Sequence, residues 1–199
     1  MITAIFVIFP FLLIALSFYF KKRQNLQNQV GGAISLPKSF WLNYTIGSWF
    51  FIPIIFLFLN VDQGIKYVFV FHLISWWLRG PLELVMIYKW FNWSPKYGIT
   101  HDVFHFFIVS ILFYYFWPME VTRPTFLAIL YLFGIIVSTF FETLFAILFF
   151  KIRGSEKKKI YFASDAPEWK TVNRITILAN FICYGLHFVN SFWAYELAI

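Results

Sequence analysis

Charged residues are scarce in this chain of 199 residues. Asp, Glu, Lys and Arg make up 13% of it, whereas a soluble domain carries roughly 25%. Hydrophobic residues make up 61%, and the 29 phenylalanines outnumber the 16 Lys and Arg plus the nine Asp and Glu residues. A water-soluble fold of this size could not bury so much apolar surface. The composition therefore excludes a soluble enzyme, a nucleic-acid-binding module and a disordered chain, and it predicts an integral membrane protein.

Cysteine and the common motifs of covalent catalysis are also nearly absent. The single cysteine, Cys183, cannot form a disulfide within the chain or a cysteine-based zinc or iron–sulfur site. No Gly-x-Ser-x-Gly motif is present, and no spacing supports a Cys/His or Ser/His/Asp arrangement. Covalent catalysis is therefore disfavoured. The four histidines are too few for the iron chemistry of desaturases and hydroxylases.

Long apolar stretches are what the chain has in abundance. A helix that crosses a membrane needs about 20 mostly apolar residues. Six stretches meet this requirement: 1–20, 40–59, 66–90, 97–117, 125–150 and 174–197. We therefore predict an all-α fold, a polytopic six-transmembrane-helix bundle that forms a single integral membrane domain over residues 1–199. The Arg79-Gly80-Pro81 sequence is expected to interrupt the third stretch, because proline removes a backbone donor.

Lysine and arginine are distributed unevenly among the segments between these stretches. Thirteen of the 16 follow the first, third and fifth stretches, and only Lys66 and Arg123 lie on the alternate side. Because positive residues are retained in the cytoplasm, we predict six spans with both termini on the non-cytoplasmic side of a plasma or inner membrane. The segment 151–171 then forms a basic cytoplasmic loop near anionic lipid headgroups.

Polar side chains within the spans are the first candidates for function, because polarity is costly there and such residues usually face the bundle interior. The candidates are His72, Arg79 and Glu83 in the third stretch, His101, Asp102 and His105 in the fourth, Glu142 in the fifth, and Asn180, Tyr184, His187 and Asn190 in the sixth. Steps of three and four residues place them on one face of each helix. We expect these polar faces to point toward one another.

Depth along the helices, at about 1.5 Å per residue, divides the candidates into two layers. The layer in the cytoplasmic half contains Glu83, His105, Glu142 and Asn180, with His101 and Asp102 at its mouth. The layer nearer the outside contains His72, His187 and Asn190, and Arg79 lies between the two. We therefore predict a polar intramembrane pocket in the cytoplasmic half.

An enzyme that acts on a lipid or another apolar substrate is the first functional hypothesis. Buried carboxylates beside a cation can serve as general acids and bases. Glu83 and Glu142 would be the acid and base, His105 a proton shuttle, and Arg79 a clamp for an anionic headgroup. The expected substrate contacts are Asn180, Tyr184, His187 and His72.

Two cofactors are weighed beside this hypothesis. His101 and His105 are one helical turn apart and, with Asp102, could hold a divalent metal ion. A single haem between His72 and His187 is the weaker alternative, and two haems are excluded because no histidine remains to pair with His101 or His105.

Two other classes of function stay open. Polar stripes also hold helices together, so the chain could be an accessory or scaffold subunit of a larger membrane complex. Buried charges on several helices are also typical of a small transporter or a proton path. The expected partners are membrane lipids and either other membrane subunits or further copies of the chain, and no nucleic acid.

Overall fold

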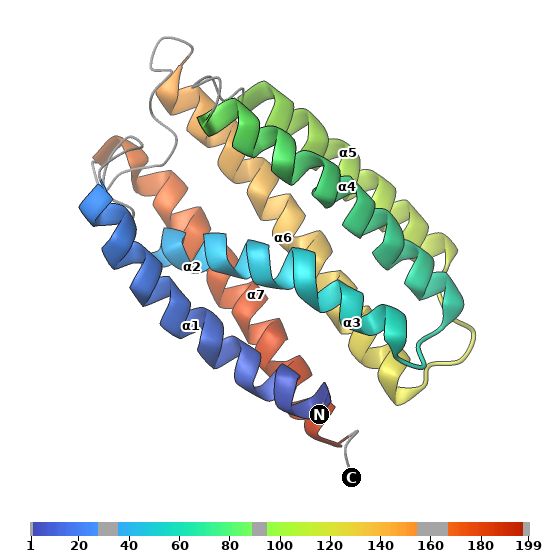
Figure 1. Cartoon of the computed structure of the whole chain (residues 1–199). Coiled ribbons are helices and arrows are strands. Elements are labelled where there is room, and N and C mark those ends of the chain that lie inside the picture. The colour runs from blue at the N-terminus through green and yellow to red at the C-terminus, as the bar shows by residue number, and fades with distance from the viewer. Residues whose placement is uncertain (1, 28–35, 89–94, 155–166, 197–199) are drawn as a thin grey trace.

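A computed structural model describes residues 2–27, 36–88, 95–154 and 167–196, and every regular element in these ranges is a helix (Figure 1). In chain order they are α1 (Ile2–Gln27), α2 (Leu36–Tyr44), the π-helix η1 (Thr45–Phe51), α3 (Ile52–Phe58), α4 (Gln63–Tyr88), α5 (Pro95–Tyr115), α6 (Arg123–Arg153), the short 3-10 helix η2 (Pro167–Trp169) and α7 (Lys170–Glu196). The all-α prediction is confirmed for this part of the chain. Residues 155–166, within the predicted basic loop, lie outside it.

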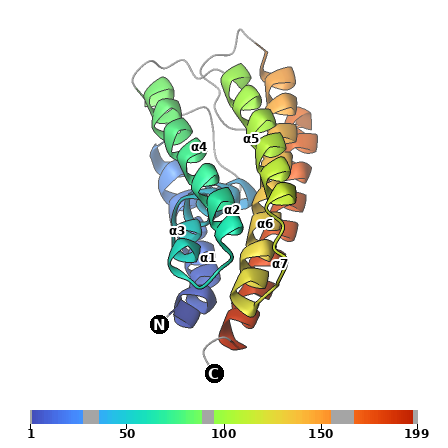
Figure 2. The ribbon, with the colours of Figure 1, turned by 90° about the vertical axis from the view of Figure 1, so that its right-hand side faces the viewer.

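Six helical rods form the bundle, because α2, η1 and α3 follow one another without a gap. Each rod contains most of one of the six apolar stretches. The strongest packing joins α6 to α7 and to α5, while α1 and α2 pack against α7. Figures 1 and 2 show the start of α1 and the end of α7 at the same end of the bundle as the α3–α4 and α5–α6 connections.

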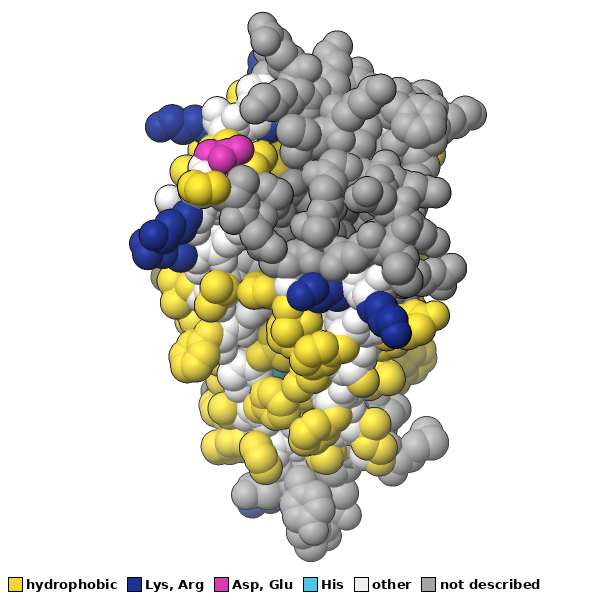
Figure 3. Space-filling view, turned by 90° about the vertical axis from the view of Figure 1, so that its left-hand side faces the viewer, with side chains coloured by type: hydrophobic (Ala, Val, Ile, Leu, Met, Phe, Trp, Pro, Cys, Tyr) yellow, Lys and Arg dark blue, Asp and Glu magenta, His cyan; other side chains and the backbone are white. Residues whose placement is uncertain are grey.

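The surface and the helix lengths agree with an integral membrane protein. Four helical segments of the described chain are long and apolar enough to cross a membrane: Ser39–Phe58, Lys96–Tyr115, Arg123–Arg153 and Pro167–Trp193. A shorter apolar stretch, Val7–Tyr19, lies in α1. Large apolar side chains such as Phe11, Phe104 and Phe181 are more than half exposed. Figure 3 shows a broad apolar band below a group of Lys and Arg side chains on one face.

The π-helix η1 arises just before a proline. Ile52 donates its backbone N–H to the carbonyl of Gly47, five residues back, which is the hydrogen bond of a π-helix. Pro53 has no backbone N–H, so the carbonyl of Trp49 lacks the partner that an α-helix would provide four residues later. This carbonyl is therefore available to a side chain from a neighbouring helix.

The predicted interruption at Arg79-Gly80-Pro81 is wrong, because α4 continues through Pro81 to Tyr88. Proline removes only one hydrogen bond from the helix, and packing holds the turn around it. A Cβ atom at Gly80 would lie 3.1 Å from the Phe50 ring, so η1 packs closely here. Arg79 is anchored on the other side by an ion pair with α5.

Helix α1 approaches the π-helix closely at a second glycine. A Cβ atom at Gly47 would lie 2.6 Å from Cζ of Phe9 and 2.8 Å from Cδ2 of Leu13, both shorter than an ordinary contact. The absence of a side chain at Gly47 therefore lets α1 pack against the rod formed by α2, η1 and α3.

We predict that Gly47→Ala destabilises the protein by about 1–3 kcal/mol, because the added methyl group overpacks this contact. Gly185→Ala is the matched control, since no atom lies within 4 Å of a Cβ at this position in α7. Equilibrium unfolding in mixed micelles, followed by circular dichroism, measures both. Equal stability of the two variants would show that α1 does not pack here.

Candidate functional site

A cluster of polar and aromatic side chains lies where η1, α4, α5 and α6 meet, and we call it the polar centre. It consists of Trp49, His72, Ser75, Trp76, Arg79, His101, Asp102, His105 and Thr139. Five of its members, His72, Arg79, Asp102, His105 and Thr139, are buried polar side chains, although they belong to helices whose outer faces are apolar. Hydrogen bonds within the centre compensate for this burial.

His72 connects α4 to the π-helix and to α5. Its Nε2 atom lies 3.0 Å from the carbonyl oxygen of Trp49, the group that Pro53 leaves without a helical partner. Its Nδ1 atom lies 3.1 Å from Nε2 of His105. Both ring nitrogens of His72 therefore face groups of the protein.

His105 has polar neighbours on two other helices. The indole Nε1 of Trp76 donates a hydrogen bond of 3.0 Å to His105 Nε2. The Nδ1 atom of His105 lies 3.4 Å from the hydroxyl of Thr139, which itself donates to the carbonyl of Ile135 at 2.9 Å. His105 thus joins α5 to α4 and α6.

A buried ion pair forms the side of the centre nearest the start of α5. Arg79 donates from Nη1 to the carboxylate of Asp102, and both side chains are almost fully buried. The guanidinium also lies over the Trp76 ring, 4.5 Å from its centroid. His101 lies within 3.3 Å of both charged groups, and its Nε2 is 2.9 Å from the Ser75 hydroxyl.

His101 is also the histidine of the centre that has access to the outside. Its side chain is 16% exposed, whereas that of Asp102 is fully buried. The ring of His101 stacks on that of His105 with centroids 5.8 Å apart, and the ring of His105 lies 5.1 Å from that of His72. Three imidazoles therefore lie in series from a partly exposed position to a fully buried one.

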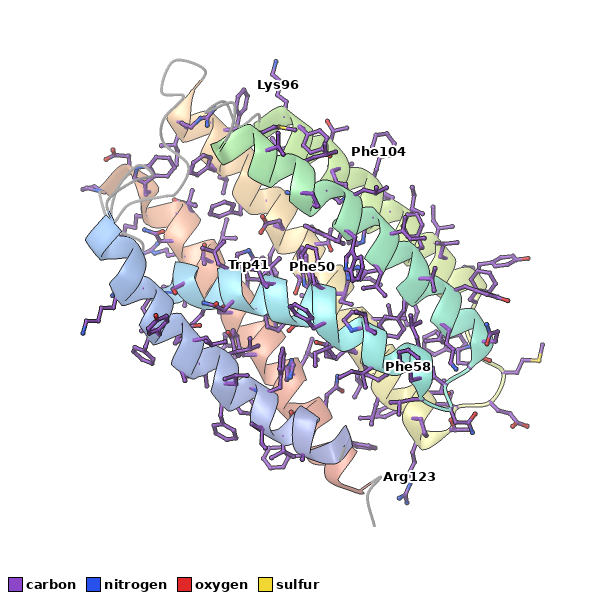
Figure 4. All side chains as sticks on the ribbon, viewed as in Figure 1. Trp41, Phe50, Phe58, Lys96, Phe104 and Arg123 are labelled. Carbon is purple, nitrogen blue, oxygen red and sulfur yellow. The ribbon has the colours of Figure 1, made fainter. Side chains whose placement is uncertain are left out.

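Glu142 is connected to the centre through aromatic rings. Its carboxylate accepts a hydrogen bond of 2.5 Å from the indole of Trp41. The Trp41 ring contacts that of Trp49 at 6.1 Å, and Trp49 contacts Trp76 at 4.1 Å. Figure 4 shows Trp41 in the middle of the bundle. Glu142 is also one helical turn beyond Thr139 on α6, so its carboxylate belongs to the surroundings of the polar centre.

The structure brings together only part of the predicted pocket. Arg79, His101, Asp102 and His105 meet as expected. The predicted separation into layers is wrong for His72, which contacts His105 because α4 and α5 cross there. The side chain of Glu83 lies outside the described part of the structure.

The predicted substrate contacts of α7 are engaged elsewhere. Asn180 and Tyr184 donate hydrogen bonds to the carbonyls of Pro37 and Phe40, and so they attach α7 to α2. His187 stacks on Phe9, with ring centroids 5.3 Å apart. The sixth span therefore contributes mainly to packing near α1 and α2.

The arrangement of side chains in the polar centre does not favour binding of either predicted cofactor. Among the described residues, no group of three or more His, Cys, Asp and Glu side chains is placed to hold a metal ion. The predicted site of His101, His105 and Asp102 therefore has no coordination set. Haem ligation by His72 would require it to give up its contact with Trp49 or with His105.

Four members of the centre, Trp49, Ser75, Trp76 and Thr139, were not predicted as site residues, and all but Ser75 carried a signal. Trp76 lies on the same helical face as His72 and Arg79. Trp49 precedes a proline by four residues, which identifies a carbonyl without a helical partner. Thr139 lies one turn from Glu142. Their roles depend on neighbours that are distant in the sequence.

We predict that Arg79→Met or Asp102→Leu alone costs roughly 3–5 kcal/mol of stability, because each leaves a buried charge without its partner. The double variant should cost less than either single change, since no unpaired charge remains. Equilibrium unfolding in mixed micelles measures all three. Additive losses in the double variant would contradict this coupling.

Comparisons with known proteins give no family for this chain. No protein-family model matches it, and no curated protein or solved structure does so. Its function must be inferred from the chemistry of the polar centre.

Proposed function

We propose that this chain is a six-span protein of the plasma or inner membrane, with its basic loops in the cytoplasm and both termini outside. Three features support this topology. Each of the six described rods contains most of one apolar stretch, the start of α1 and the end of α7 lie at one end of the bundle, and 13 of the 16 Lys and Arg residues follow the first, third and fifth stretches in the sequence. Figure 4 shows Lys96 and Arg123 at opposite ends of the bundle. In the proposed orientation Lys96 lies at the cytoplasmic end, as the positive-inside rule expects, and Arg123 is an exception at the other end.

In this orientation the polar centre is reached from the cytoplasmic half of the membrane. His101 is the seventh residue of α5, so it lies about 9 Å from the cytoplasmic end of that helix. His105 lies one turn deeper. The partly exposed edge of His101 therefore faces the region of the lipid headgroups and upper acyl chains.

We further propose that the polar centre carries out acid/base chemistry on a lipid-like or anionic substrate. The observation that supports this proposal is the series of three imidazoles, from partly exposed His101 to buried His72, beside a buried Arg79–Asp102 pair. Imidazoles accept and release protons near neutral pH. Arg79 adds a positive charge that attracts an anionic headgroup, and Asp102 orients Arg79 and His101.

Chemistry within the membrane is favoured over proton conduction across it. On the far side of His72, the side chains that α3 and the start of α4 bury over more than one helical turn are apolar: Phe56, Ile65, Val68 and Phe69. A conducting path would need polar groups or water there. Among the described residues of α3 and α4, no buried polar side chain continues the series of imidazoles on this side, as expected for a site that exchanges protons with a bound substrate.

An accessory role in a larger membrane complex is the second candidate. The observation in its favour is that the polar groups of the centre mostly bond to each other and thereby join four helical elements. Hydrogen bonds of this kind hold transmembrane helices together without any reaction. In that case the polar centre would affect stability and assembly alone.

We predict that single cysteines introduced at exposed loop positions report the topology. Met119→Cys, between α5 and α6, should react with a membrane-impermeant maleimide in intact cells. Lys170→Cys, at the start of α7, should react only after permeabilisation. The native Cys183 is fully buried and provides the unlabelled background. Labelling of both positions from the same side would exclude the proposed arrangement.

We predict that the purified protein, reconstituted into vesicles of a total membrane lipid extract, changes the amount of at least one lipid species over time. The His101→Gln and His105→Gln variants should slow this conversion at least ~100-fold, because general acid/base groups contribute that much or more. Mass spectrometry of the extracted lipids measures the conversion.

Thr176→Val is the matched control for a buried polar substitution. Thr176 is buried in α7, away from the polar centre, and bonds only to its own helix. This variant should convert lipid at the wild-type rate. If no species changes with the wild-type protein, or if the histidine variants are as active, the catalytic proposal fails. Co-elution of the chain in a defined hetero-complex would then favour the accessory role.

A further inference from the structure

The hydrogen bonds of the polar centre determine where the protons of His72 must be. The carbonyl oxygen of Trp49 can only accept a hydrogen bond, so Nε2 of His72, 3.0 Å away, carries a proton and donates it. A neutral imidazole has one N–H. In the neutral state, Nδ1 of His72 therefore presents a lone pair.

The same reasoning determines the state of His105. The indole of Trp76 can only donate, so Nε2 of His105 carries a lone pair. The hydroxyl proton of Thr139 is directed to the carbonyl of Ile135, so this hydroxyl accepts from Nδ1 of His105. His105 is therefore a neutral imidazole with its proton on Nδ1.

These two assignments conflict at the point where the histidines meet. His72 Nδ1 and His105 Nε2 lie 3.1 Å apart, and in the neutral state neither nitrogen carries a proton, while the lone pair of His105 Nε2 also accepts from the Trp76 indole. A cation between the two nitrogens removes the conflict. A metal ion would need further ligands, and no group of three suitable side chains exists among the described residues. A proton needs only these two nitrogens.

We infer that the His72–His105 pair is a proton-binding site, in which one proton forms an N–H bond to His72 Nδ1 and donates a hydrogen bond to His105 Nε2, which also accepts from the Trp76 indole. Binding of the proton rests on the hydrogen bonds alone. Its use as the resting place of a proton removed from a substrate rests on the proposed function. In that step the substrate loses one proton, the pair gains one, and no electron is transferred.

The charges around the pair make this site one that can load and unload. Arg79 on α4 and the neighbouring His101 on α5 oppose a further positive charge, as does burial itself. Asp102 on α5 and Glu142, one turn beyond Thr139 on α6, favour it. From η1, Trp49 presents an uncharged carbonyl. Gain of a hydrogen bond thus opposes the cost of a buried cation, and the difference between the two determines the pH at which the pair takes up its proton.

Solid-state NMR of the full-length protein in lipid bilayers, with ¹⁵N-labelled histidine, tests this inference. The chain has only four histidines, so each ring can be assigned. On acidification we expect one N–H···N correlation between His72 and His105, formed by uptake of one proton per protein. His72→Gln and His105→Gln should abolish it, and His187→Gln, in a buried histidine outside the pair, should leave it unchanged.

The wild-type spectrum decides the matter even if a variant does not fold. Two neutral rings throughout the range in which the protein stays folded, or two rings that take up protons separately without a shared correlation, would overturn the inference. Lipid conversion that depends on His101 and His105 without a shared proton would leave the proposed function standing. A shared proton without any lipid conversion would support the proton-binding site and contradict the proposed function.

Discussion

Burial of charge inside an apolar bundle is the constraint on which the rest of the structure depends. Arg79 and Asp102 lie in helices whose outer faces carry large apolar side chains, so neither can reach water without leaving the bundle. Each therefore needs the other, and their pairing sets how α4 lies against α5. The histidines of both helices come within reach of one another as a consequence. The polar centre is thus a product of the same contact that holds this pair of helices together.

Backbone irregularity supplies the second half of the centre. The π-helix and Pro53 leave the carbonyl of Trp49 without a helical partner, and His72 forms a hydrogen bond with it. Aromatic rings then extend the contacts, from Trp76 through Trp49 and Trp41 to the carboxylate of Glu142. Indole groups suit this position because one edge donates a hydrogen bond while the rest of the ring packs like a hydrocarbon. The tryptophans therefore connect polar groups without bringing water into the core.

The arrangement is asymmetric along the membrane normal that we propose. One side of the centre has a partly exposed histidine and an ion pair, and on the other side α3 and the start of α4 bury phenylalanine and aliphatic side chains. Such asymmetry suits a site that meets its substrate from one leaflet. The facing nitrogens of His72 and His105 lie at the buried end of this series of imidazoles.

Composition and periodicity alone determined the class of the protein, the six helical rods and the helix faces that carry Arg79, Asp102 and the histidines. These properties are local, since apolar length and a period of 3.6 residues can be counted along the chain. Only the tertiary structure decided that His72 contacts His105 and that Trp41 donates a hydrogen bond to Glu142. It alone also decided that Asn180 and Tyr184 form hydrogen bonds with α2. It also decided that α4 continues through Pro81. Such outcomes depend on the angles at which helices cross and on neighbours supplied by distant segments, and no periodic pattern in one helix specifies them.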